Sequence, residues 1–173
     1  MGELDYEARA YDQLCQSYRA IDDFRSKLLG FLPLATGAGI WTLSKEVVDA
    51  SSIGVARADV FTAVGAFGAL VTLGLFAYEI YGIKKCGALI KAGQRAEALL
   101  KVKNGQFLSR PQNVAHVVNE PFAAGVIYPA VLAAWTFLAL AFKWPKANPA
   151  VPLLVFIVGL VGTLLYDRVL RRA

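Results

Sequence analysis

Hydrophobic residues along this chain gather into four blocks that are separated by charged stretches. The blocks lie at about 24–43, 60–83, 122–142 and 151–166. An α-helix rises about 1.5 Å per residue, so each of the first three blocks can cross the roughly 30 Å hydrocarbon core of a bilayer. The fourth is short for this task and implies local thinning of the bilayer or burial in protein. The pattern predicts an all-α membrane protein with four transmembrane helices.

The residues before the first block predict a polar helix over 3–27. Its apolar stripe has heptad-type spacing and consists of Tyr11, Leu14, Tyr18, Ile21 and Leu28. Arg25 occupies the stripe position between the last two members. No glycine or proline interrupts the run before Gly30, so we expect this helix to continue directly into the first span. Pro33 lies inside that span and is expected to kink it.

The longest connection, 84–121, joins the second and third spans. Residues 84–103 mix glycine, alanine and leucine with lysine, arginine and glutamate, which is typical of an amphipathic helix. Asn104 and Gly105 follow as a stop or turn signal. We therefore expect a connecting helix outside the membrane.

Positive charges lie mostly on one side of this topology. Hydrophobic residues make up 57% of the 173 residues, and the formal net charge is +5. Of the 18 lysines and arginines, fourteen lie before Leu28 (where the uncharged part of the first span begins), in the 84–121 connection or after the fourth span, and four lie in the other two loops. Because cytoplasmic loops collect Lys and Arg, we expect a multi-pass protein of the cell membrane with both termini in the cytoplasm. Topology and anionic lipid explain the charge without a specific nucleic-acid partner.

This orientation divides the chain into two parts. Residues 1–27 form a cytoplasmic helix that is continuous with the first span, and residues 28–173 form the four-helix transmembrane domain. Both cysteines, Cys15 and Cys86, then lie in a reducing compartment, and we expect them to be free thiols.

Four charged residues stand at the entry to the first span. Asp22 and Arg25 are three residues apart, and Asp23 and Lys27 are four apart, so each pair shares a helix face. One interpretation is an interfacial face stabilised by these ion pairs. The other is a ring of charge at the mouth of a pore, formed if several chains assemble around an axis.

Two glutamates lie close to membrane spans. Glu79 occupies the last turns of the second span, where an ionisable group is a functional candidate. It is within reach of Lys84 or Lys85, so a structural ion pair and a role in a pore or relay both stay open. Glu120 precedes the third span and fits a helix-start acid that faces the positive end of the helix dipole.

Small residues recur four apart in the spans, and such pairs allow helix backbones to approach closely. Packing within one chain and packing between chains both fit this pattern. The glycines expected to pack are Gly37, Gly39, Gly68 and Gly159.

The charged entry and the apolar run that follows it resemble a known group of proteins. Residues 18–39, above all Leu28-Leu29-Gly30-Phe31-Leu32-Pro33, are similar to small bacterial membrane effectors of anti-phage systems, including the SLATT group. The resemblance covers about the first two thirds of the chain and implies a similar architecture, although those effectors typically have two spans.

Motifs for catalysis are missing from the sequence: it contains no GxSxG, no P-loop, no His-rich metal cluster and no array of spaced carboxylates. We therefore expect no enzyme, no cofactor and no metal. The preferred function is a non-enzymatic interaction or pore-forming subunit that forms a homo-oligomer in the lipid bilayer, with residues 3–27 and 84–120 open to a cytoplasmic protein partner. A small transporter, with Pro33 marking a broken helix, is the alternative. A membrane-embedded enzyme is the third.

Overall fold

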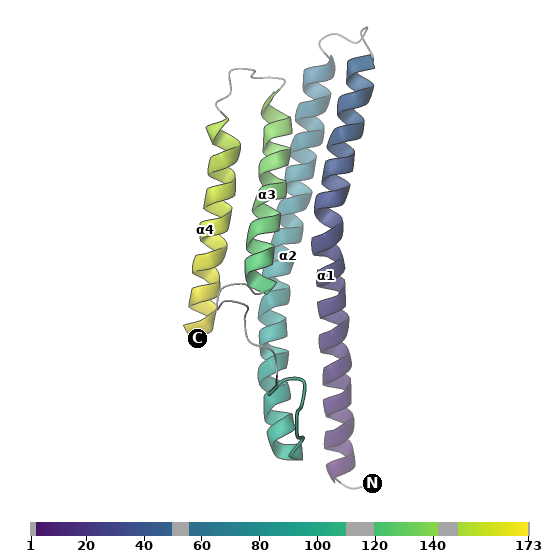
Figure 1. Cartoon of the computed structure of the whole chain (residues 1–173), viewed down its shortest axis with the longest axis vertical. Coiled ribbons are helices and arrows are strands. Elements are labelled where there is room, and N and C mark those ends of the chain that lie inside the picture. Colours follow the sequence, from purple (N-terminus) through teal and green to yellow (C-terminus); the bar gives the residue numbers. More distant parts are fainter. Residues whose placement is uncertain (1–2, 50–55, 110–119, 142–148, 173) are drawn as a thin grey trace. The chain divides into compact units, whose positions relative to one another are not determined.

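The computed structural model describes residues 3–49, 56–109, 120–141 and 149–172. Within these residues the chain forms four helices and no strand, so the prediction of an all-α fold is confirmed (Figure 1). The helices are α1 (Glu3–Asp49), α2 (Ala56–Leu100), α3 (Glu120–Ala141) and α4 (Ala150–Arg172).

α1 is a single helix of 47 residues. It contains both the polar segment 3–27 and the first hydrophobic block, and no break separates them. Pro33 lies inside the helix, where its missing N–H leaves the carbonyl of Leu29 without its usual partner. The helix therefore carries a polar sequence into an apolar one without a turn.

α2 is also continuous, over 45 residues. It joins the second hydrophobic block to the segment 84–100, which the sequence pattern had indicated as a separate connecting helix. The helix ends at Leu100, where the Val102 N–H donates to the Glu97 carbonyl at 3.0 Å. Lys101 and Asn104 then adopt left-handed backbone conformations, with φ of 52° and 58°. We call the segment 101–109 that follows the helix the strap.

The chain divides into two compact units. Unit 1 consists of residues 1–28 and 79–119, and unit 2 consists of residues 29–78 and 120–173. α1 and α2 thus each contribute one segment to either unit, whereas α3 and α4 belong to unit 2 alone.

In unit 2, α3 packs against α2 through small residues. A Cβ on Gly65 would collide with the Ala139 backbone, and one on Gly68 would collide with the Trp135 ring. The Thr62 hydroxyl donates to the Ala139 carbonyl at 3.1 Å. The absence of side chains on the two glycines is therefore what allows the helices to approach this closely.

The same device joins α3 to α4. A Cβ on Gly125 would lie 2.9 Å from Thr163, and a Cβ on Gly159 would lie 2.8 Å from Pro129. Among the glycines that the sequence suggested for packing, Gly68 and Gly159 thus make tight contacts within the chain. A Cβ on Gly39 would reach only 4.0 Å from the Trp135 ring, and one on Gly37 would meet nothing within 4 Å.

Apolar side chains of unit 2 point outward to an unusual extent. Over the described residues, two helices are long and apolar enough to cross a membrane, α2 from Asp59 and α3 over Pro121–Ala141. In the most apolar 18 residues of each helix, only 17% in α2 and 33% in α3 are buried inside the protein. The apolar part of α4, Ala150–Tyr166, is shorter. The core helix of a soluble domain would be mostly covered, so these surfaces require lipid or protein around them.

Candidate functional site

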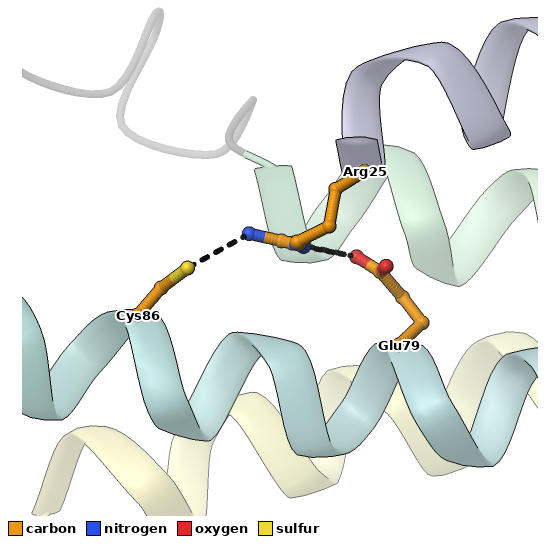
Figure 2. A network of polar contacts seen from close by, with 3 residues as sticks. All are labelled: Arg25, Glu79 and Cys86. Atoms are coloured by element: carbon orange, nitrogen blue, oxygen red, sulfur yellow. Dashed lines mark hydrogen bonds and ion pairs between the residues drawn. The ribbon is translucent and has the colours of Figure 1, made fainter. Parts of the chain in front are cut away.

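The most distinctive feature of unit 1 is a buried ion pair between α1 and α2. The Arg25 guanidinium donates to Glu79 Oε1 from Nε at 2.9 Å and from Nη2 at 2.6 Å (Figure 2). Its Nη1 reaches the sulfur of Cys86 at 3.6 Å. Arg25 and Glu79 are only 3% and 1% exposed, so both charges have lost their hydration.

The sequence brings these groups together through one face of α2. The buried positions of this face are three, four, seven and four residues apart, which keeps them on one side of a helix. They are Glu79, Gly82, Cys86, Gly93 and Glu97. A Cβ on Gly82 would lie 3.4 Å from Arg25 Cδ, an ordinary contact distance, so the arginine side chain passes directly beside this glycine. The face is polar or small throughout, unlike the aliphatic seam of an ordinary helix pair.

The geometry of the Arg25–Glu79 ion pair is suited to selecting one register of α1 on α2, but it is not ideal for stabilising the fold. Both strong hydrogen bonds from Arg25 end on the same oxygen of Glu79. The other oxygen, Oε2, is buried and has no hydrogen-bond partner among the residues that the structure describes. Desolvating two charges costs several kcal/mol each, and only excellent geometry offsets that cost. We therefore expect the pair to contribute more to the register of α1 on α2 than to the net stability of the fold.

A second buried carboxylate, Glu97, holds the strap. Its Oε1 accepts from the Tyr11 hydroxyl at 2.8 Å and from the Phe107 N–H at 2.9 Å, and its Oε2 accepts from the Leu108 N–H at 2.7 Å. Burial alone raises the pKa of Glu97, but the three donors outweigh it, and the net pKa lies below the usual glutamate value. Burial, together with the Glu97 carboxylate and the neighbouring Cys15, raises the pKa of Tyr11 well above its ordinary value. Tyr11 thus stays a proton donor to an ionised Glu97.

Phe107 anchors the strap on the apolar side of the same contact. Its ring is 1% exposed and fills the space that a side chain on Gly93 would occupy. Tyr11 and Tyr18 meet it edge to face, with ring centroids at 6.3 and 5.5 Å. Such aromatic pairs add roughly 0.5–1.5 kcal/mol beyond the area that they bury. The sequence analysis did not predict the contact between Glu97 and Phe107. Two signals were visible: Gly93 lies four residues before Glu97, and Phe107 follows the Asn104-Gly105 turn.

The charged residues at the entry to the first span fall into two environments. Asp23 and Lys27 form an exposed ion pair on α1 at 2.6 Å, with side chains 62% and 75% exposed. Asp22 is half-buried. Arg25, from the same cluster, turns inward to α2. An exposed pair four residues apart stabilises a helix by only about 0.3–0.5 kcal/mol.

The two glutamates considered in the sequence have different outcomes. Glu79 forms its ion pair with Arg25, 54 positions away in the chain, whereas Lys84 and Lys85 are exposed. The sequence pattern had suggested those lysines as partners because they are close along the helix. Glu120 is the first residue of α3, and its side chain lies outside the described residues.

An open apolar hollow of about 150 Å³ lies at the far end of unit 1 from the ion pair. α1 contributes Ala10 and Leu14 to its wall, and α2 contributes Leu99. It adjoins Tyr11 and therefore the contact with Glu97. Its lining is suited to an apolar side chain rather than to a polar ligand.

Within the described ranges, no three His, Cys, Asp or Glu side chains gather as a metal site would require. Cys15 and Cys86 are buried there, and neither forms a disulfide. Comparison with known protein families, with curated proteins and with solved structures finds no match to this chain. Its function must therefore be inferred from the two buried carboxylates, the apolar surfaces and the charge distribution.

Proposed function

We propose that this chain is a non-enzymatic subunit of a membrane-embedded homo-oligomer, with unit 1 as its cytoplasmic interaction module. The proposal has two parts, a location in the membrane and self-association. The resemblance of residues 18–39 to SLATT-like effectors concerns the membrane architecture alone.

Support for the membrane location comes from the place where α1 and α2 change character. α1 is polar up to Lys27 and apolar beyond it, and α2 is apolar up to Ile83 and basic from Lys84. The Arg25–Glu79 ion pair joins the two helices close to both of these transitions. The polar segments of both helices then leave the bilayer on the same side. Four spans with cytoplasmic termini fit this arrangement and the distribution of lysine and arginine.

The apolar stripe along α1 is the observation that supports self-association. Tyr11 and Tyr18 turn toward Phe107, but Leu14, Ile21 and Leu28, which are seven residues apart, stay only half-buried. The exposed residues Ala10, Ser17 and Phe24 interleave with them and complete a spacing of alternating four and three residues. This spacing is typical of a coiled-coil seam, and its leucine and isoleucine side chains are only partly covered within unit 1. A second copy of the chain supplies a matching seam, and the hollow beside Leu14 receives a side chain from it.

The test is the oligomeric state of the full chain in native nanodiscs, measured by mass photometry. We expect an oligomer for the wild type and a shift toward monomer for Leu14→Gln with Ile21→Gln. The control is Tyr6→Gln with Leu108→Gln, which removes two exposed apolar side chains of unit 1 outside the seam. A wild type that is monomeric at all concentrations, or a control that dissociates as readily as the seam variant, would refute self-association through this seam.

The exposed Asp23–Lys27 pair favours a pore as the form of this assembly. In a ring of subunits it would place alternating charges at the membrane entry, where they select permeating ions. We expect liposomes that contain the wild type to pass ions, and Asp23→Asn with Lys27→Gln to change the ion selectivity. Oligomers that leave the liposomes tight would limit the function to interaction.

A further inference from the structure

The outer face of α2 in unit 1 carries positive charge only. Lys84, Lys91 and Arg95 are exposed, and each precedes a buried residue of the α1-facing side by two positions, which places it about 200° around the helix. Lys85 is exposed beside them. Glu97, the one acid between residues 84 and 103, is buried against the strap. α1 differs, because its exposed Lys27 is paired with Asp23.

The membrane-side end of this face has the features of a bilayer interface. Tyr81 is 62% exposed and lies one turn before Lys84 and Lys85. Tyrosine is enriched at the level of lipid headgroups, since its ring is apolar and its hydroxyl is polar. Ala88, which is exposed and small, leaves space between the lysines and Lys91. Side chains on a helix lean toward its N-terminus, so these lysines lean toward the apolar part of α2.

We propose that the face of α2 from Tyr81 to Lys91 binds the phosphate groups of anionic phospholipids. Charge complementarity and position favour this occupant, because the lysines begin where the apolar part of α2 ends, within the depth of a headgroup layer. A soluble polyanion would be served equally well by cations further along the chain, such as Lys101 and Lys103, which are also exposed. The proposal rests on the membrane location and is independent of self-association.

The size of the expected effect follows from surface electrostatics. One basic side chain close to an anionic membrane surface changes the binding constant by about fivefold at physiological ionic strength. Replacing Lys84 and Lys85 together should therefore weaken binding of an anionic lipid by roughly tenfold to thirtyfold. Replacing Lys101 and Lys103 should change it by about twofold or less, because electrostatic attraction is screened within about 10 Å.

The experiment uses the full chain in a neutral detergent and native mass spectrometry. The probes are phosphatidylglycerol and phosphatidylcholine with identical acyl chains, added to the wild type, Lys84→Gln with Lys85→Gln, and Lys101→Gln with Lys103→Gln. We expect the wild type and the Lys101/Lys103 variant to retain phosphatidylglycerol in preference to phosphatidylcholine. The Lys84/Lys85 variant should lose that preference.

Three results would overturn the proposal. One is an equal loss in both double variants, which would mean that net charge alone attracts the lipid. Another is displacement of phosphatidylglycerol by millimolar inorganic phosphate, which would assign the face to a free anion. The third is tighter binding of a 20-nucleotide single strand that is lost in the Lys84/Lys85 variant, which would assign the face to nucleic acid. Carbonate extraction of membranes is run in parallel: release of the chain would refute the membrane location, whereas a retained chain without lipid preference would refute this inference alone.

Discussion

Glu79 and Glu97 are buried carboxylates on the same face of α2, but different groups stabilise them. Glu79 faces a counter-charge from α1 and has one oxygen without a hydrogen bond in the described part of the chain. Glu97 faces no cation in the described contacts, and three hydrogen bonds use both of its oxygens. The first contact depends on a charge pair, whereas the second depends on donor geometry. The two should therefore respond differently to substitution and to pH.

Removing one partner of the ion pair should be more harmful than removing both. Arg25→Met leaves the Glu79 carboxylate buried without a counter-charge, and we expect a loss of about 3–5 kcal/mol in the free energy of unfolding. The double variant Arg25→Met with Glu79→Leu should lose less than Arg25→Met alone. Denaturant unfolding of the purified chain in detergent micelles measures both, and Asp23→Asn with Lys27→Gln, an exposed pair, is the control at about 0.5 kcal/mol or less. A mild effect of Arg25→Met would contradict the buried-pair argument.

Lowering the pH should release the strap. The folded-state pKa of Glu97 lies below its unfolded value, so its contribution is fully present above about pH 4.3 and is lost as the pH falls through the folded value. We expect hydrogen-exchange protection of the Phe107 and Leu108 amides to decline in this acidic range. Glu97→Gln should have weaker protection at neutral pH and no such decline. An acid response that persists unchanged in Glu97→Gln would assign it to another group, and Asp23→Asn is the control that should behave as wild type.

Sequence reasoning identified the participants of the ion pair but not the pairing. Arg25 was visible as a charge in an apolar stripe, and Glu79 as a carboxylate in a span. The contact joins residues 54 apart, and one sequence contains no signal for a pairing at that distance. The burial of Glu97 was not predicted for a different reason. A glutamate within a basic amphipathic segment is equally consistent with a solvent-exposed helix face and with a buried one. Burial through backbone donors of the strap becomes visible only in three dimensions.

At the scale of elements, hydrophobic periodicity predicted the helical segments and one of the two joins between them. It predicted that the helix over 3–27 continues into the first span, and α1 has that continuity. It treated residues 60–83 and 84–103 as separate because their composition changes at Lys84. α2 nevertheless runs through that change, since a change in polarity alters the surroundings of a helix and not its backbone hydrogen bonds. Glycine positions predicted packing only in part, because spacing does not tell which helix face has a neighbour.

Two glycines of α2 provide a matched test of helix packing in unit 2. A Cβ on Gly68 would collide with the Trp135 ring, whereas one on Gly74 would meet nothing within 4 Å. We expect Gly68→Ala to lower the free energy of unfolding by about 1–3 kcal/mol, because α3 must shift to accommodate it. Gly74→Ala should be neutral or stabilise the helix by up to about 1 kcal/mol. Unfolding in micelles compares them, and an equal loss in both would show that glycine flexibility matters more than the contact with Trp135.

At the scale of the whole molecule, the helices and the charges give separate indications of topology. α2 and α3 are long and apolar enough to cross a membrane. The four-span proposal includes α1 and α4 because both helices expose apolar side chains, among them Phe31 and Leu154. Unit 1 gathers the polar ends of α1 and α2, as the proposed cytoplasmic module requires. An even number of spans then returns the C-terminus to the side of the N-terminus.

Reporter fusions test this topology directly. Green fluorescent protein fused after Ala173 should fluoresce in a bacterial host, because it matures in the cytoplasm. Alkaline phosphatase inserted between residues 143 and 149 should be active, because that loop is expected on the outer side. The reciprocal fusions, with the reporters exchanged, should both be silent. Active phosphatase at the C-terminus would mean an odd number of spans and would remove one of the four proposed.

The contacts that hold the strap restrict the residue type at position 107 but leave position 108 almost unrestricted. Glu97 binds the main-chain N–H groups of Phe107 and Leu108 rather than their side chains. Leu108, whose side chain is exposed, can therefore vary in a mutational library to almost any residue except proline, which lacks the donor. Phe107 has no such freedom, because its ring fills the space above Gly93. Position 108 is thus a site where a dye or affinity handle can report on the closure of the strap without opening it.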